Sequence, residues 1–163
     1  MKNNSASHKP ESPLKMAVDK TEDVQGRFKT GLGAVKGSER SKFIVPYPRN
    51  LTGSVDIDTA TAARYPQVNR WDYAVEYNKE TFFIEVHPAS TSEVSTVIAK
   101  LAWLKQWLKE KAPEINALKS KSKCPYYWVF TNRFSILPNS KYARQLAQLN
   151  LMPVKQWKYT SLC

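Results

Sequence analysis

Alternating hydrophobic and polar positions are clearest in the middle of the chain. Residues 71–77 and 81–87 are rich in aromatic and β-branched side chains, and a short polar segment separates them. This pattern predicts a β-hairpin. Hydrophobic residues then recur at every third or fourth position from about residue 94 to 111, which predicts a long helix ended by Pro113.

Shorter patterned segments lie on both sides of this hairpin and helix. An imperfect helical spacing predicts an earlier helix, two short extended runs predict strands, and a later run that is hydrophobic throughout predicts a strand covered on both faces. The predicted segments are a helix at 15–30, strands at 42–45 and 53–57, a strand at 126–131, a helix at 142–149 and an edge strand at 151–154.

The order of these segments predicts an α/β fold with an αβββαβ core. Strand–helix–strand units of this spacing favour a central mixed β-sheet flanked by helices on both faces. The chain of 163 residues has the length of one domain. We therefore expect a single domain over residues 14–163, preceded by a polar, disordered tail over residues 1–13.

The composition excludes several classes of protein. The hydrophobic fraction of 42% and the charged fraction of 24% are near globular averages. No stretch approaches the ~18 uncharged apolar residues of a membrane-spanning helix. The first residues also lack the apolar segment of a signal peptide. We expect a cytoplasmic protein that does not associate with membranes.

The net charge of +11 is large for a chain of this length and is unevenly distributed. Residues 1–70 carry 12 basic and 7 acidic side chains, residues 71–111 carry 5 and 6, and residues 112–163 carry 8 and 1. An acidic centre between basic flanks suits a protein that holds a phosphodiester electrostatically and places a metal ion against it.

Two acidic residues and a histidine mark the hairpin as a candidate site. Glu85 and His87 are two residues apart, so they project from the same face of their strand. Asp72 opens the neighbouring strand and is expected near the end of the strand that carries Glu85. Two converging carboxylates are ligands that Mg²⁺ prefers, and His87 could ligate the metal, orient water or accept a proton.

Other acidic residues offer alternatives to this site. Asp56 and Asp58 form a competing pair, whose ordinary role would be in a turn. Glu76 shares the face of Asp72 but lies near the turn, where we expect it in solvent. Without further information, the carboxylates of the hairpin could equally be solvated side chains.

The segment order and the hairpin acids together resemble the PD-(D/E)xK nuclease superfamily, the fold of restriction endonucleases and Holliday-junction resolvases. The topological resemblance covers roughly residues 15–150. In that family an Asp on the second strand and Glu-x-Lys on the third form the motif, which is short and degenerate. Asp72 resembles the motif's Asp, Glu85 its second acid, and His87 stands in the place of the lysine.

The resemblance implies a restriction-endonuclease-like fold and a catalytic site made of Asp72, Glu85, His87 and Glu22. Asp72 and Glu85 would hold Mg²⁺ or Mn²⁺, and Glu22 is the candidate for the acid that the first helix of the family often contributes. His87 departs from the pattern, because a neutral imidazole lacks the fixed positive charge of lysine. Lys100 on the following helix is a candidate to supply that charge.

Basic side chains in the last third of the chain are candidates for binding nucleic acid. Their number in a segment of net charge +7 favours contact with phosphates. Trp103 and Trp107 could stack on bases, form a protein interface or, more commonly, pack against the chain's own loops. The basic candidates are Lys119, Lys121, Lys123, Arg133, Lys141 and Arg144.

These expectations lead to one functional hypothesis and two alternatives. The hypothesis is a metal-dependent nuclease (a hydrolase) that cleaves phosphodiester bonds, with DNA favoured over RNA as the substrate. The first alternative is a catalytically inactive nucleic-acid-binding module on the same fold. The second is a basic protein-interaction factor with an acidic partner. Whether the chain forms a homodimer is left open by the sequence.

Overall fold

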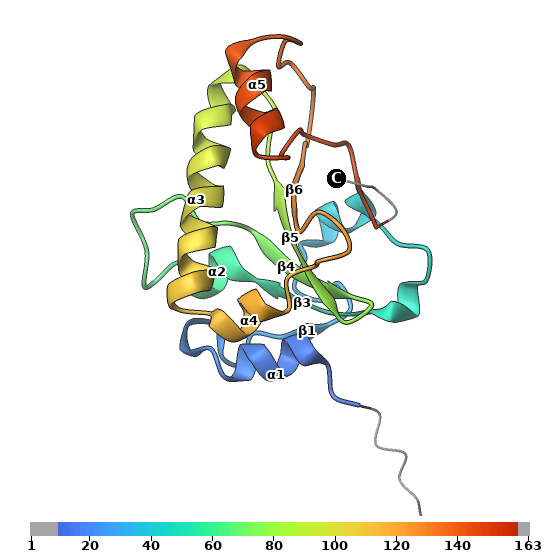
Figure 1. Cartoon of the computed structure of the whole chain (residues 1–163). Helices are drawn as coiled ribbons and strands as arrows, with labels where there is room; N and C mark the ends of the chain where they lie inside the picture. Colours follow the sequence, from blue (N-terminus) through green and yellow to red (C-terminus); the bar gives the residue numbers. More distant parts are fainter. Residues whose placement is uncertain (1–9, 160–163) are drawn as a thin grey trace, which may run out of the picture.

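The hairpin and the long helix predicted from the sequence form the centre of the protein in a computed structural model, which describes residues 10–159 (Figure 1). The helices are α1 Pro13–Asp19, α2 Ile57–Thr61, α3 Val94–Glu110, α4 Pro113–Ala117 and α5 Lys141–Gln148. The strands are β1 Lys29–Thr30, β2 Phe43–Ile44, β3 Leu51–Asp56, β4 Tyr73–Tyr77, β5 Glu80–Val86, β6 Tyr126–Val129 and β7 Trp157–Lys158. The 3₁₀ segments are η1 Glu22–Val24, η2 Gly37–Lys42, η3 Pro48–Asn50 and η4 Thr91–Glu93.

Strands β4 and β5 form the predicted hairpin. Asn78 and Lys79 connect them, and both have positive φ angles, 51° and 64°. A two-residue turn with positive φ at both positions matches the right-handed twist of the two strands. The hairpin therefore aligns the beginning of β4 with the end of β5, and Tyr73 pairs with Ile84.

The central sheet has five strands in the order β1-β3-β4-β5-β6. All neighbouring pairs are antiparallel except β5 and β6, which are parallel and are connected through α3 and α4. The predicted α/β class with a mixed sheet is confirmed. Strands β4 and β5 lie inside the sheet, so each is paired with a neighbouring strand at both edges.

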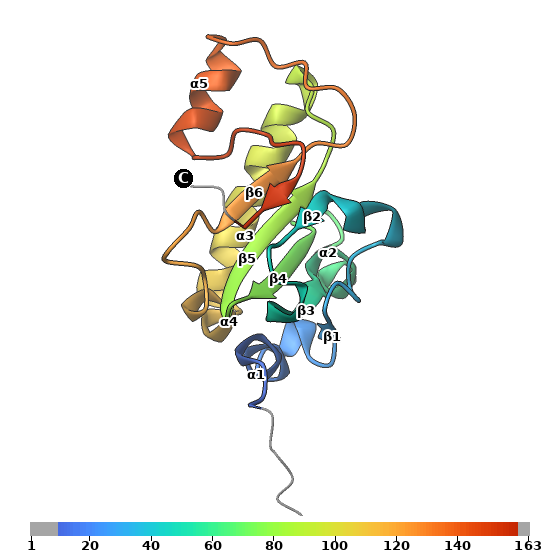
Figure 2. The same cartoon turned by 90° about the vertical axis from the view of Figure 1, so that its right-hand side faces the viewer.

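The five α-helices contribute to one hydrophobic cluster, which covers the sheet face that carries Ala74, Phe83 and Trp128. The opposite face carries residues such as Val75 and Phe82 and packs against a second cluster. Segments of the small parallel sheet β2–β7 and of the chain around η2 cover this second face (Figure 2). The expectation of helices on both faces is therefore wrong for the α-helices of residues 10–159.

The N-terminal region also differs from the prediction. The helix expected at 15–30 ends at Asp19, and η1 and β1 follow it. Gly26 has a φ of +74°, which is incompatible with a continuous α-helix. The tail expected over residues 1–13 lies largely outside the described residues, but Ser12 caps α1 and Pro13 begins it.

Near the C-terminus, helix α5 and strand β6 confirm the predictions, whereas the edge strand at 151–154 is wrong. Val154 makes only an isolated bridge to Val129, and the last strand is β7, which pairs with β2 away from the central sheet. Among residues 10–159, none of the helices has the length and apolar character needed to cross a bilayer.

Candidate functional site

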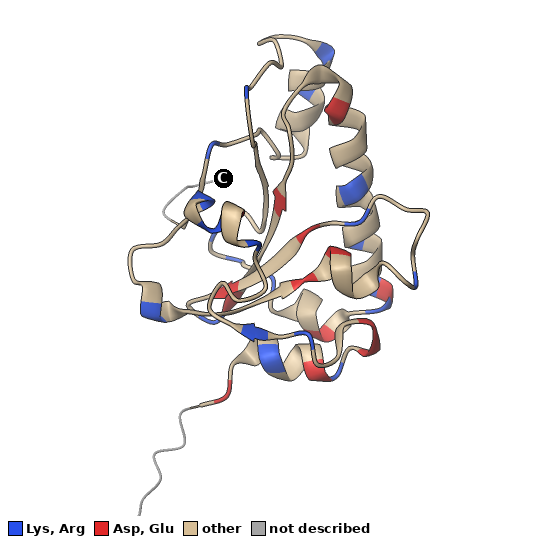
Figure 3. Cartoon of the chain, turned by 180° about the vertical axis from the view of Figure 1, so that it is seen from behind, with Lys and Arg blue, Asp and Glu red and all other residues tan. Residues whose placement is uncertain are grey.

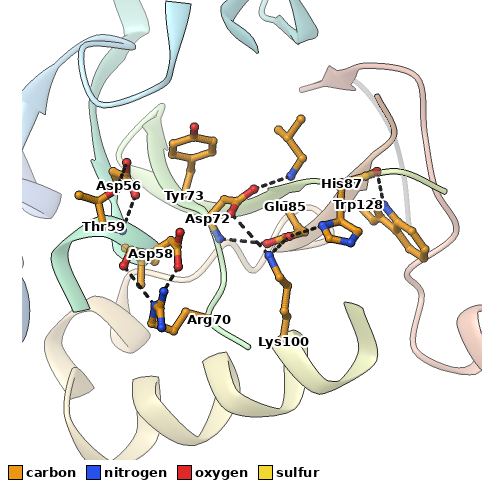
Figure 4. Close-up of polar contacts among 12 residues, drawn as sticks. Asp56, Asp58, Thr59, Arg70, Asp72, Tyr73, Glu85, His87, Lys100 and Trp128 are labelled. Carbon is orange, nitrogen blue, oxygen red and sulfur yellow. Dashed lines mark hydrogen bonds and ion pairs between the residues drawn. The ribbon is translucent and has the colours of Figure 1, made fainter. Parts of the chain in front are cut away.

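The hairpin brings Asp72 and Glu85 together through reciprocal bonds between side chain and backbone (Figure 4). The backbone N–H of Asp72 donates to Glu85 Oε2 over 3.0 Å, and the N–H of Val86 donates to Asp72 Oδ2 over 3.0 Å. The backbone oxygen of Asp72 accepts from the N–H of Ile57 at 2.8 Å, which ties the residue to the end of β3. Each carboxylate therefore has one oxygen fixed by the sheet.

The second oxygen of each carboxylate faces Lys100 on α3. Lys100 Nζ donates to Glu85 Oε1 and lies 3.7 Å from Asp72 Oδ1. The Glu85 side chain is 0% exposed, whereas those of Lys100 and Asp72 are 13% and 19% exposed. We call Asp72, Glu85 and Lys100 the acid–lysine cluster; solvent reaches it from the side of Asp72 and Lys100.

The cluster combines two acids with one permanent positive charge. Burial raises the pKa of the Glu85 carboxyl well above its usual range, and the neighbouring Asp72 charge adds to the effect. Burial also raises the pKa of Asp72, against the opposing charge of Lys100. Although burial alone would lower the pKa of Lys100, the charges of Glu85 and Asp72 raise it. Both carboxyls therefore hold a proton more readily than exposed ones, and Lys100 is kept in its charged form.

His87 lies beside the cluster but both of its ring nitrogens face carboxylates. His87 Nδ1 lies 3.5 Å from Glu85 Oε1, and Nε2 lies 2.6 Å from Glu93 Oε2. The backbone oxygen of His87 accepts from Trp128 Nε1 at 2.9 Å. The expected convergence of Asp72, Glu85 and His87 is thus present, but the lysine on α3 contacts both acids, and His87 contacts only one of them.

The structure places the other candidate acids in separate interactions. Glu22 is exposed in η1 and forms an ion pair with Arg64, with 2.6 Å between Oε1 and Nη2. Asp56 caps α2 through the N–H of Thr59, and Asp58 pairs with Arg70.

Glu76 is buried, contrary to our expectation. It accepts from the Ser12 hydroxyl and from the N–H of Leu14, each at 2.6 Å, and from the Thr52 hydroxyl. Sequence reasoning missed this role because the partners are more than twenty residues away along the chain. Glu76 joins α1 to the central sheet.

The basic candidates fall into two groups at opposite ends of the sheet. Lys119, Lys121 and Lys123, the pre-β6 lysines, precede β6, and the N–H of Lys121 donates to Glu80 at the start of β5. Glu80 and Glu85 are five residues apart on one strand, or about 16 Å. Figure 3 shows Lys and Arg distributed over both ends of the protein.

The post-β6 cations, Arg133, Lys141 and Arg144, follow β6 and are exposed. Because β5 and β6 are parallel, the chain after β6 lies at the same end of the sheet as Glu85. The bridge between Ala89 and Phe134 confirms this position. Only this second group is at the end of the sheet that holds the acid–lysine cluster.

Within residues 10–159, no group of three or more His, Cys, Asp or Glu residues is arranged to hold a metal ion. Comparison with known proteins finds no matching family model, no similar curated protein and no similar solved structure. The function must therefore be inferred from the chemistry of the acid–lysine cluster.

Proposed function

We propose that the protein is a divalent-metal-dependent nuclease of the PD-(D/E)xK type, in which Lys100 supplies the positive charge that His87 does not. The convergence of Lys100 with Asp72 and Glu85 carries this proposal. Asp72 directly precedes β4 and Glu85 is on β5, an arrangement similar to the family motif, and the lysine comes from the helix that follows.

The donor set fits a hard divalent cation. Asp72 Oδ1 and Glu85 Oε1 are the two carboxylate oxygens without a backbone partner, and both face the position of Lys100 Nζ. Mg²⁺ is commonly held by one or two carboxylates together with water and substrate phosphate, so a larger protein ligand set is not required. Both carboxylates are largely buried, so a bound cation would offset the cost of removing their charges from water.

The residues of the cluster have distinct proposed roles. Asp72 and Glu85 would hold Mg²⁺ or Mn²⁺, which when bound polarises the phosphodiester and lowers the pKa of a water molecule. Lys100 stabilises the negative charge that develops on the attacked phosphate. His87, held by Glu93, keeps the Glu85 carboxylate in position from the other side.

Replacing Glu85 with Gln tests the proposed function. We expect wild-type protein to cleave single-stranded DNA, plasmid or tRNA in the presence of Mg²⁺ or Mn²⁺. Glu85→Gln should lower the rate at least about a hundredfold, because losing a metal ligand removes several kcal/mol of transition-state stabilisation. Binding to nucleic acid should be retained, because the variant loses a negative charge.

Glu80→Gln is the matched control, since it makes the same change at the opposite end of β5 and should leave cleavage unchanged. Equal cleavage by wild type and Glu85→Gln would exclude the acid–lysine cluster as the active site. If wild type binds nucleic acid but no divalent metal supports cleavage, the second candidate is favoured, a catalytically inactive nucleic-acid-binding module. This second candidate is supported by the pairing of Lys100 with both acids, which neutralises part of their charge without a metal.

A further inference from the structure

The last two turns of α3 and the loop after α2 form a pocket with three aromatic side chains, next to the acid–lysine cluster. Trp103 and Trp107 are stacked, with ring centroids 5.8 Å apart and an interplanar angle of 14°. Tyr65 contacts Trp103 edge to face at 5.7 Å. These rings border a cavity of about 220 Å³ that Val68 and Lys111 also line. We call it the aromatic pocket.

The two tryptophans of the pocket differ in what they can bind. Trp107 is 3% exposed, and its Nε1 donates to Asp23 over 2.9 Å. Its position is therefore fixed by the protein. Trp103, the other ring of the stacked pair, is only partly buried, so it is the ring that a ligand can contact. The fixed Trp107 and Tyr65 hold the Trp103 ring in a defined orientation.

Helix α3 aligns this pocket with Lys100. Trp103 follows Lys100 by three residues and Trp107 follows it by seven, so all three project from one side of the helix. Three residues correspond to about 4.5 Å along the helix axis. The loop between α2 and β4, which carries Tyr65 and Val68, continues directly into Asp72 and lies beside α3 in Figure 1.

The ligand that suits this arrangement combines a flat ring with a neighbouring negative charge. Lys111 and Glu110 line the end of the pocket, and Lys100 lies one turn before Trp103 on the same side of α3, so Lys111 and Lys100 are the cations at its two ends. A nucleotide has both features, because its base can stack on an indole while its phosphate meets these lysines. In a duplex each base is already stacked between neighbours, so its ring faces are inaccessible without unstacking.

We infer that the aromatic pocket binds an unpaired base of single-stranded nucleic acid, next to the phosphodiester held at the acid–lysine cluster. The inference rests on the proposed nuclease function, since that function places a phosphodiester beside Asp72 and Glu85. It assigns Trp103 as the residue that stacks on the base and selects single strands over duplexes.

Fluorescence titration with a single-stranded thymidine decamer in EDTA tests the pocket without cleavage. In wild type the decamer should quench tryptophan fluorescence and bind more tightly than a duplex of ten base pairs. Trp103→Ala should weaken binding of the decamer about five- to a hundredfold, the range for losing one stacked base. Trp103→Phe, which keeps an aromatic face, should restore most of the affinity.

Val68→Asp is a second variant, placed at the exposed rim of the pocket, where a negative charge should repel the strand without changing the core. Ile44→Asp is its control, because Ile44 on β2 has the same exposed fraction of 42%. Weaker decamer binding by Val68→Asp but not Ile44→Asp supports the pocket. Wild-type affinity in folded Trp103→Ala and Val68→Asp overturns it, as does equal binding of decamer and duplex. Cleavage by Mg²⁺-loaded wild type is measured separately, so loss of the nuclease proposal is distinguishable from loss of the pocket.

Discussion

Each carboxylate of the acid–lysine cluster has one oxygen bound to the backbone and one facing Lys100. In the proposed function, Asp72 and Glu85 would hold the cation, and the two oxygens that are free of backbone partners are those that Lys100 faces. Lys100 and the cation would therefore compete for these two oxygens.

Lys100→Met tests this competition. We expect the variant to lose cleavage but to bind Mn²⁺ more tightly, because the cation becomes the only positive charge between two acids. A tenfold gain in affinity corresponds to about 1.4 kcal/mol of extra stabilisation by the metal. Thermal unfolding with and without Mn²⁺ measures it as a larger shift of Tm in the variant.

Lys109→Met is the control for the loss of one lysine, since Lys109 is exposed near the end of α3. Its Tm shift with Mn²⁺ should equal that of wild type. A smaller Mn²⁺ shift in Lys100→Met than in wild type would mean that the lysine does not compete with the metal.

At the scale of elements, the hairpin and α3 were predictable because their hydrophobic periods are long and regular. The segment before β3 was not, because its structure depends on distant contacts. A Cβ at Gly53 would lie 2.0 Å from the Phe28 ring, so this glycine lets Phe28 pack directly on β3. The helical spacing that includes Phe28 therefore predicted a helix that is absent, because Phe28 packs on strand β3 and not on the next turn of a helix.

Asp23 connects η1 to α3 and to the loop after α2. It accepts from Trp107 Nε1, from the Tyr65 hydroxyl at 2.7 Å and from Arg64 Nη1 at 2.7 Å. Burial alone would raise the pKa of Asp23, but the hydrogen bonds of Tyr65 and Trp107 and the Arg64 charge lower it below 3.8. Because the folded pKa is depressed, this stabilisation is present above about pH 3.8 and is lost as the pH falls below it.

Asp23→Asn should destabilise the protein by about 2 kcal/mol at pH 7, because it removes charge-assisted hydrogen bonds from a buried site. The difference from wild type should shrink as the pH falls below about 3.8, where Asp23 of the unfolded chain takes up a proton before Asp23 of the folded protein does. Urea unfolding at several pH values measures this difference. Glu22→Gln changes the exposed partner of the same Arg64 and should lower the free energy of unfolding by less than about 1 kcal/mol. A pH-independent difference would contradict the charge-based role of Asp23.

At the scale of the molecule, the sequence predicted that Asp72 and Glu85 lie close together, because hairpin pairing and strand alternation are local rules. It named Lys100 only as one candidate, because which side chain of α3 reaches the hairpin depends on how the helix packs. It also treated the basic residues after position 112 as one group. The structure separates them, because β6 carries the chain from one end of the sheet to the other.

The separation of the basic residues gives a prediction for nucleic-acid binding. Replacing the three post-β6 cations, Arg133, Lys141 and Arg144, with Gln should weaken binding of the thymidine decamer, since they lie at the same end of the sheet as the acid–lysine cluster. The slope of log affinity against log salt should fall by about 2, or about 0.7 for each lost phosphate contact on a single strand.

Replacing the three pre-β6 lysines, Lys119, Lys121 and Lys123, with Gln is the matched control, because it removes the same net charge. Their backbone pairs with Thr81 and Glu80, about 13–16 Å along β5 from Glu85, so their loss should change the slope by less than one contact, about 0.7. Both sets lie mostly on the surface, and melting temperatures should stay close to that of wild type. Equal losses of affinity in the two triple variants would mean that only the total charge attracts nucleic acid. A loss of affinity confined to the post-β6 set would instead indicate that the bound strand runs from α5, past Lys100, to the aromatic pocket.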